Sequence, residues 1–287
     1  MMSTHDQAAV RPRAIGRVIL AILGLLLIVL FAGLGTWQVV RLQWKLALIE
    51  RVESRVGAAP VSPPAPERWA QVTKDSDEYR HVRLAGRFLY DYTTPVQAVS
   101  ELGAGFWLLT PLCTTDGSVV LVNRGFIPAS GNTAQRYPAR RAEGNPCAAA
   151  AGPAHTLTGL LRIAEPGGGF LRDNDPVRNR WFSRDVAAIA AARGLSPTAS
   201  NGGPAVAPNG APVIAPFFVD AARGQDPAGA PDQPVGGLTV ISFQNNHLVY
   251  AITWYALALM VAGAWWYVAR SGAKGEAARL EDNGSKV

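Results

Sequence analysis

The residue of this sequence best placed to do chemistry is His247. It directly precedes an uncharged run, residues 248–269, which is long enough to cross a bilayer as a helix. An imidazole at a bilayer surface can bind a hydrophobic metal cofactor that arrives from the membrane. The plainer alternative is a polar residue at the start of a helix, with Asn246 as the N-cap. The residues alone leave both interpretations open.

The residues that follow His247 suggest what kind of ligand could lie beside it. On a helix, His247 shares one face with Tyr250, Ala251, Trp254 and Ala258. Small residues flanked by aromatic rings could form a shallow slot for a flat macrocycle. If His247 is a metal ligand, Tyr250 and Trp254 would line the cofactor site.

A second group of side chains with helical spacing lies near the N-terminus. Trp37, Arg41, Trp44 and Leu48 follow i, i+4, i+7, i+11 spacing, which places them on one face of a helix. Tryptophans at the end of a membrane helix commonly form an interfacial belt. Alternatively, Arg41 could stack between the two indoles in a platform that faces the rest of the protein or a partner.

Signatures of enzymes are absent from the sequence, so we do not expect an enzyme. It contains no GxSxG elbow, HExxH pair, Walker loop or GxGxxG fingerprint. The glycine run 167–169 lacks the lysine of a phosphate loop and is typical of a turn. Turns and helix capping explain the closest set of carboxylates, which is Asp173, Asp175 and Asp185. The other histidines are expected to be solvated; they are His5, His81 and His155.

Two membrane helices are predicted to position these residues. The uncharged runs 18–40 and 248–269 can each span a bilayer, and the first helix is expected to continue to about residue 55. A cleaved signal peptide is the alternative for the first run, but its apolar core is longer than usual. Basic residues on the short tails, 1–17 and 270–287, place both termini in the cytoplasm. Basic residues just after the first run argue the other way, although long domains cross a membrane largely regardless of charge.

Charge and cysteine content narrow the possible functions. The net charge of +6 is spread along the chain without a basic and aromatic cluster, so we expect no nucleic acid partner. Cys113 and Cys147 would lie on the outer side, where an oxidising compartment permits a disulfide. Without CxxC spacing, a redox or zinc site is not expected. A bridge and two unpaired thiols are both compatible with the sequence.

The chain between the helices, residues 57–243, is predicted to form one extracytoplasmic domain. A proline-rich linker, 57–66, opens it, and one short helix is expected over 185–193, with Ser183 as its N-cap and Gly194 at its end. Runs of alternating or β-branched residues predict strands over 79–88, 103–110 (closed by Pro111), 118–124, 156–163, 213–219 and 238–243. Flexible loops are predicted over 141–155 and 194–237. Because the connections are too short for βαβ crossovers, we expect a mainly antiparallel β (α+β) domain, which could close into a barrel, flanked by the two transmembrane helices.

Four ordered blocks of the sequence resemble the Surfeit-one family, membrane factors for the biogenesis of haem–copper cytochrome oxidase. Residues 35–45 (GTWQVVRLQWK) are similar to the family's G-x-W-Q-x-x-R-x-x-W-K, and residues 120–128 (VLVNRGFIP) to V-N-R-G-aromatic-x-P. Residues 174–185 resemble N-x-P…N-x-W-F-x-R-D, and residues 245–255 (NNHLVYAITWY) resemble N-x-H-x-x-Y-A-x-T-W. Phe126 stands where tryptophan is commoner in the family.

This resemblance implies a role in oxidase assembly, with cytochrome c oxidase subunit I and the haem a synthase as partners. The family's bacterial members are thought to bind haem a through the histidine of the last block, so the resemblance assigns His247 as an axial ligand to the haem iron. It also implies a partner-binding surface on the first block, formed by Trp37, Gln38, Arg41, Trp44 and Lys45. The alternative is a cofactor-free scaffold that holds assembly intermediates, in which His247 is structural.

Composition suggests where such a protein would lie. An Ala- and Arg-rich sequence with a short N-terminus and no evident transit peptide favours a bacterial inner membrane. Membrane lipid would then surround both apolar helices.

Overall fold

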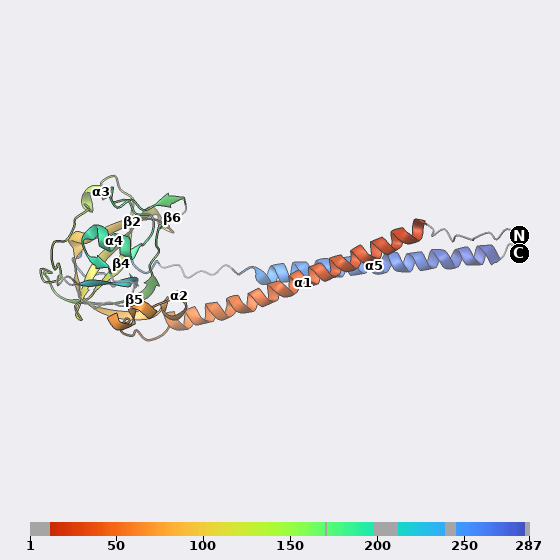
Figure 1. The fold of residues 1–287 in the computed structure, drawn as a ribbon, viewed down its shortest axis with the longest axis horizontal. Coiled ribbons are helices and arrows are strands. Elements are labelled where there is room, and N and C mark those ends of the chain that lie inside the picture. Colours follow the sequence, from red (N-terminus) through yellow and green to blue (C-terminus); the bar gives the residue numbers. More distant parts are fainter. Residues whose placement is uncertain (1–11, 170, 198–211, 239–244, 285–287) are drawn as a thin grey trace, which may run out of the picture. The chain divides into compact units, whose positions relative to one another are not determined.

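The computed structural model describes residues 12–169, 171–197, 212–238 and 245–284. Figure 1 shows the elements, which fall into two units. The helical unit comprises Met1–Glu50 and Ser242–Val287, and the barrel unit comprises Arg51–Ile241.

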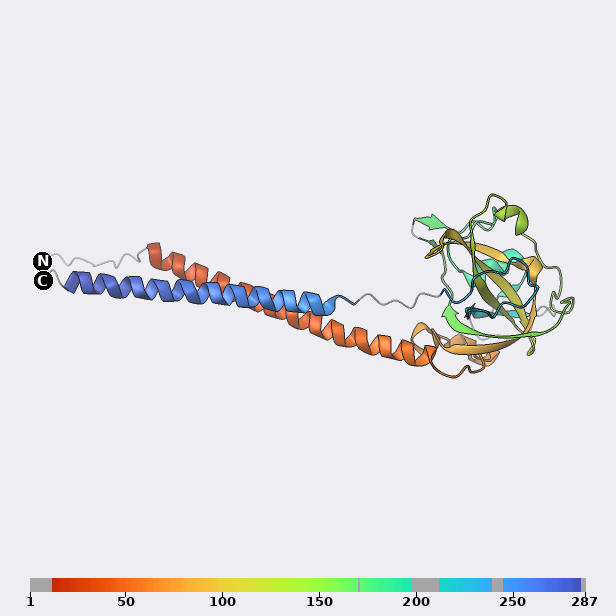
Figure 2. The same ribbon diagram turned by 180° about the vertical axis from the view of Figure 1, so that it is seen from behind.

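The helical unit consists of two long helices, α1 (Pro12–Val56) and α5 (His247–Gly284). The segments Val18–Val56 and His247–Ser271 are long and apolar enough to cross a membrane, as the sequence predicts. Residues of α1 and α5 lie against each other in pairs whose numbers run in opposite directions, so the two helices are antiparallel (Figure 2). The pairs are Gly24 with Trp265, Phe31 with Trp254 and Gln38 with His247.

The barrel unit is built on a sheet that closes on itself. The order of the closed strands is β1-β5-β9-β4-β3, and β3 pairs again with β1. All of these pairs are antiparallel except β4 with β9. The fold class predicted from the sequence is therefore confirmed, including the barrel-like closure. The strands are β1 (His81–Phe88), β3 (Gly103–Thr114), β4 (Val119–Pro128), β5 (His155–Ile163) and β9 (Val213–Ala221).

Shorter elements surround this barrel. Two strands extend the sheet, because β2 (Thr94–Ser100) pairs with β3, and β8 (Ser196–Pro197) pairs with β9. A separate hairpin joins β6 (Gly168–Gly169) and β7 (Arg172–Asp173). The remaining elements are the 3₁₀ helices η1 (Pro66–Gln71) and η2 (Tyr90–Tyr92) and the helices α2 (Lys74–Asp77), α3 (Thr133–Arg136) and α4 (Val186–Arg193).

Apolar side chains pack on both faces of the sheet. One core cluster contains Trp69, Leu84, Val122 and Phe217, with the Trp69 ring edge-on to Phe217. A second cluster on other side chains of the same strands packs against α4 and includes Leu121, Trp181, Ile189 and Phe218. Burial on both faces explains why β4 and β9 are nearly continuous apolar runs rather than alternating ones.

Three local predictions differ from the structure. Pro111 does not close its strand, because β3 continues to Thr114. On one edge of β3, strand β2 pairs as far as Leu109, and strand β1 pairs from Leu112 onwards. Pro111 lies between these two pairings, so its missing N–H breaks no hydrogen bond on this edge. The sequence also gave no sign of β2. The N-cap of α4 is Asp185 instead of Ser183, since its carboxylate accepts a 3.0 Å bond from the amide of Ala188.

Other predictions are confirmed or fall outside the description. Gly194 ends α4 in the left-handed conformation, as expected. Cys113 of β3 and Cys147 are joined in a disulfide with a Cα–Cα distance of 5.6 Å, so the bridge, of the two alternatives, is the one found. Of the strand predicted over 238–243, only Leu238 is among the described residues, and the rest lies outside them.

The segment that follows β9, predicted as part of a flexible loop, is held by the V-N-R-G block of β4. Arg124, which is buried, donates to both carboxylate oxygens of Asp226, at 2.6 and 2.9 Å. Phe126 and Val235 exchange two backbone hydrogen bonds of 2.9 Å. Gly125, which lies between Arg124 and Phe126 in the sequence, has a φ of +140°, and a Cβ on it would lie 2.5 Å from the backbone of Val235. Only glycine fits at this position.

We expect Gly125→Ala to lower the free energy of unfolding by about 3 kcal/mol, because it combines a strained backbone with a clash against Val235. Urea unfolding of the purified protein in detergent, followed by tryptophan fluorescence, measures this. Gly131→Ala is the matched control, since a Cβ there meets nothing within 4 Å. Equal losses in the two variants would contradict the role given to Gly125.

Candidate functional site

The two sequence blocks at the ends of the chain are joined by hydrogen bonds, one of which involves His247. Nδ1 of His247, the first residue of α5, lies 2.7 Å from Oε1 of Gln38 on α1. An amide oxygen only accepts hydrogen bonds, so Nδ1 carries a proton in this contact, and the neutral form of the ring would be the Nδ1–H tautomer. Nε2 then carries the lone pair. Among the residues that the structure describes, none other than Gln38 bonds to this ring.

Aromatic contacts continue the seam between the helices. The ring of Trp254 stacks on Phe31 of α1 with centroids 5.7 Å apart. One residue further, the hydroxyl of Tyr255 lies 3.0 Å from that of Thr36. The ring of Tyr255 lies against Gly35, where a Cβ would be 2.9 Å from it. Glycine in the first block therefore lets α1 approach this ring.

The small residues of the predicted slot are already covered in this structure. Ala251 is 2% exposed and Ala258 is 8% exposed. They share a helix face with His247 and Trp254, the residues that contact α1. Tyr250, by contrast, lies beside this face and is exposed. A flat ligand would therefore lie at the edge of the seam, next to Tyr250 and His247, rather than between the helices.

The predicted partner-binding residues of α1 are arranged along an exposed stretch of helix. Trp37 and Trp44 are 54% and 52% exposed. The guanidinium of Arg41 lies 4.9 Å from the centre of the Trp44 ring. The predicted stacking of Arg41 between two indoles is thus found on one side, and no such contact with Trp37 occurs within the described part of the chain. Lys45 lies on the same helix, one residue after Trp44.

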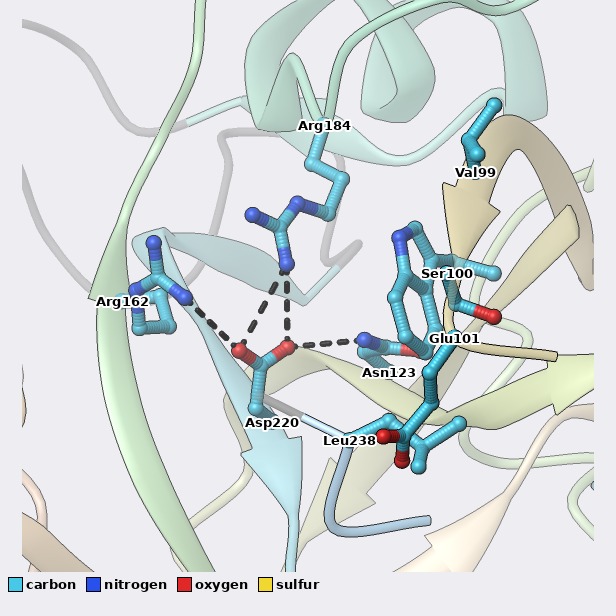
Figure 3. Close-up of a pocket in the computed structure, with 9 residues that line it drawn as sticks. Val99, Ser100, Glu101, Asn123, Arg162, Arg184, Asp220 and Leu238 are labelled. Atoms are coloured by element: carbon cyan, nitrogen blue, oxygen red, sulfur yellow. Dashed lines mark hydrogen bonds and ion pairs between the residues drawn. The ribbon is translucent and has the colours of Figure 1, made fainter. Parts of the chain in front are cut away.

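The other two blocks meet inside the barrel unit, around Asp220 at the end of β9. Its carboxylate accepts from Asn123 of β4 at 2.8 Å, from Arg184 at 3.2 Å and from Arg162 of β5 at 3.0 Å (Figure 3). Asp220 is only 3% exposed. These residues line a cavity of about 240 Å³. Sequence reasoning passed over Asp220 and Arg162, although a lone carboxylate in an apolar run was a signal, because a buried charge needs a partner.

Opposite charges are matched within this cluster. Arg184 also binds Glu165, with its Nε donating to Oε2 at 3.0 Å, and Arg162 donates to Glu78 at 3.4 Å. Burial raises the pKa of Glu165, but the hydrogen bonds and charge of Arg184 outweigh it, so the pKa lies below its ordinary value. The cluster therefore joins β4, β5 and β9 to the segment before α4.

A second polar cluster explains the asparagine and tryptophan of the third block. Arg193 of α4 is buried and donates to Thr94 at 2.8 Å and to Asn179 at 2.7 Å. The indole of Trp181 donates to the same Asn179 oxygen at 2.9 Å. Burial lowers the pKa of Arg193 to about 10, so it keeps its charge at neutral pH. These contacts fasten α4 to β2.

Among the described residues, the two units therefore differ in the groups that they offer to a ligand. Nowhere in the described ranges do three or more His, Cys, Asp or Glu side chains gather as they would around a metal ion. The barrel unit's polar clusters are internally paired. The helical unit offers one imidazole with a free lone pair beside an exposed aromatic ring. The candidate site is therefore His247 with the neighbouring ring of Tyr250.

A chain that combines a barrel unit with two helices long and apolar enough to cross a membrane indicates a class of membrane-associated proteins. Comparison with known proteins gives the family: the SURF1 family model matches residues 25–259. Surfeit locus protein 1 of Homo sapiens is 33% identical over 250 residues, which cover 81% of this chain and 72% of the human protein. The SURF1-like protein of Monosiga brevicollis is 32% identical over 253 residues, or 84% of each chain. The chain belongs to the SURF1 family.

The ion pairs of Glu165 predict how stability depends on pH. A carboxylate whose folded pKa is lowered contributes stability above its unfolded pKa, of about 4.3, and loses it as the pH falls through the folded value. We therefore expect Glu165→Gln to lower the midpoint of thermal unfolding at pH 7, and the gap to wild type to narrow below about pH 4. Glu143→Gln, an exposed site, should follow wild type. A gap that is constant with pH would contradict this assignment.

Proposed function

We propose that this protein is an assembly factor for haem–copper cytochrome c oxidase that binds haem a through His247 and passes it to subunit I. The family supports the role in assembly. The observation in this chain that carries the haem proposal is the hydrogen bond between His247 and Gln38. Histidines that ligate metals commonly donate their other ring N–H to an acceptor, which fixes the tautomer and the ring orientation.

The residues around His247 suit a flat, apolar ligand. Nε2 would be the iron ligand, with the exposed ring of Tyr250 beside it and Trp254 held against Phe31. Haem a, when bound, would supply an iron atom that takes an axial ligand from imidazole. Because haem a carries an apolar tail, keeping it at the bilayer surface avoids exposing that tail to water. A single protein ligand would also ease release.

Topology fits transfer on the outer side of a bacterial inner membrane. Both termini would be cytoplasmic and the barrel unit periplasmic. The Cys113–Cys147 disulfide agrees with an oxidising compartment. The haem a synthase would donate the haem, subunit I would receive it, and lipid would surround α1 and α5. Nucleic acid has no part in this scheme, and the protein would not itself act as an enzyme.

A cofactor-free scaffold is the second candidate, and the exposed tryptophans of α1 favour it. Helix α1 continues for 18 residues beyond Gln38 to Val56, or roughly 27 Å at 1.5 Å per residue. Trp37, Gln38, Arg41, Trp44 and Lys45 would then offer folding intermediates of the oxidase an aromatic and cationic surface. In this scheme the Gln38–His247 bond only fastens α5 to α1.

His247→Ala should reduce the haem that copurifies with the protein roughly tenfold or more, because the iron loses its protein ligand. The measurement is extracted haem per polypeptide, from cells that also make haem a. His155→Ala is the control, since it removes an imidazole from the barrel unit. Equal haem in the His247→Ala variant and wild type would refute the haem proposal.

Gln38→Ala should weaken haem binding roughly tenfold, because Nδ1 loses its acceptor and the ring its fixed orientation. Gln38→Glu, which keeps an acceptor at this position, should retain haem and lower its reduction potential. Haem titration and potentiometry measure the two effects. If both variants bind haem like wild type, Gln38 has no positioning role.

The scaffold makes a different prediction. The double change Trp37→Ala with Arg41→Ala should reduce copurification of subunit I at least about tenfold if the α1 surface is a binding hot spot. Haem content should then be unchanged. Recovery of subunit I at the wild-type level would count against the surface.

A further inference from the structure

The barrel unit has one strand whose outer edge is largely open. Strand β2 pairs along its length with β3 on one side. On the other side, among the residues that the structure describes, it meets only an isolated parallel bridge, between Val96 and Trp181. The amide of Gln97 donates to the carbonyl of Trp181 at 2.8 Å. This bond shows which residues of β2 direct their backbone groups outward.

Alternate residues of a strand direct their N–H and C=O to opposite sides. Since Gln97 points outward, Val99 does too, and so does Pro95, whose missing N–H does no harm there. Past the bridge, three outward groups remain: the carbonyl of Gln97 and the amide and carbonyl of Val99. No described residue forms a backbone hydrogen bond with them on that side. Such groups are a template for another strand.

A groove of about 570 Å³ lies along this same edge. Its walls combine the backbone of β2 with the rings of Phe106 and Phe182, and small residues leave it open: Ala104, Gly105, Ala129 and Gly169. The side chain of Val99 is 84% exposed, and Leu171, at the tip of the β6–β7 hairpin, is 88% exposed. Exposed apolar side chains beside a groove mark an interaction site.

The rim of the groove is cationic. Arg172 lines it, with its guanidinium 5.4 Å from the centre of the Phe182 ring, and Arg180 lies 5.9 Å from the same ring. Within the described ranges, Arg172 forms no ion pair, and its guanidinium donates a hydrogen bond to the side-chain oxygen of Gln97 at 3.5 Å. An acidic group on a ligand would meet an unmatched charge here.

We propose that the outer edge of β2 and the adjoining groove bind an extended segment of a partner polypeptide as an added strand. The segment satisfies the backbone groups of Gln97 and Val99, places alternate apolar side chains in the groove and directs a carboxylate at Arg172. A lipid tail would fill the groove but leave the backbone groups unsatisfied, so a polypeptide fits better. The site lies wholly in the barrel unit and is independent of haem binding at His247.

The test selects phage-displayed random octapeptides on the full-length protein in nanodiscs and measures the selected peptides by fluorescence anisotropy. We expect sequences that alternate apolar residues and include an acidic one. Val99→Pro removes the outward amide without touching the β3 ladder, and should weaken binding at least about fivefold. Val99→Thr keeps the amide and should have less than half that effect. Arg172→Glu should discriminate against acidic peptides.

Three results would overturn the proposal. The first is a lack of enrichment over empty nanodiscs, and the second is peptide binding that Val99→Pro leaves unchanged. Quenching of a fluorophore attached at Leu171→Cys by brominated lipid, without peptide selection, would assign this face to the membrane and would also overturn it. None of these outcomes bears on haem, so they are distinguishable from a failure of the haem proposal.

Discussion

The antiparallel contact between α1 and α5 is the constraint on which the proposed function depends. It places residues 209 positions apart in the sequence, Gln38 and His247, within 2.7 Å of each other. Glycine and threonine on α1 meet tyrosine on α5 a few residues away. Helix contacts in a membrane gain nothing from apolar burial alone, so small residues and hydrogen bonds carry them. The seam therefore supplies both the packing and the orientation of the imidazole.

The barrel unit relies on a different principle, the matching of buried charges. Asp220 forms ion pairs with Arg162 and Arg184 beside the three strands, and Glu78 and Glu165 pair further with these arginines. Removing one partner from such a group is strongly destabilising because it leaves another charge buried and unpaired. Two of the four sequence blocks are explained by these ties, through Asn123, Arg184 and the buried Arg124. They hold the barrel together.

Much of this architecture is predictable from the sequence, and there are physical reasons why the rest is not. Helix α1 contains a long uncharged run, and strands β4 and β9 are nearly continuous apolar runs, so their existence is predictable. Strand β2 is not, because its outer edge is open and its pattern is irregular. The resemblance singled out both Gln38 and His247. Their contact depends on how the two helices are aligned along each other, and the spacing of residues within one helix does not predict that alignment. Asp220 was missed because its partners come from distant strands.

The most direct test of the central claim is the resonance Raman spectrum of the ferrous haem-loaded protein, made with ¹⁵N-labelled histidine. A single imidazole ligand predicts an iron–histidine stretching band that shifts on labelling and disappears in His247→Ala. Bound haem without such a band in the wild type, or a band that survives in His247→Ala, would contradict the assignment of His247 as the ligand.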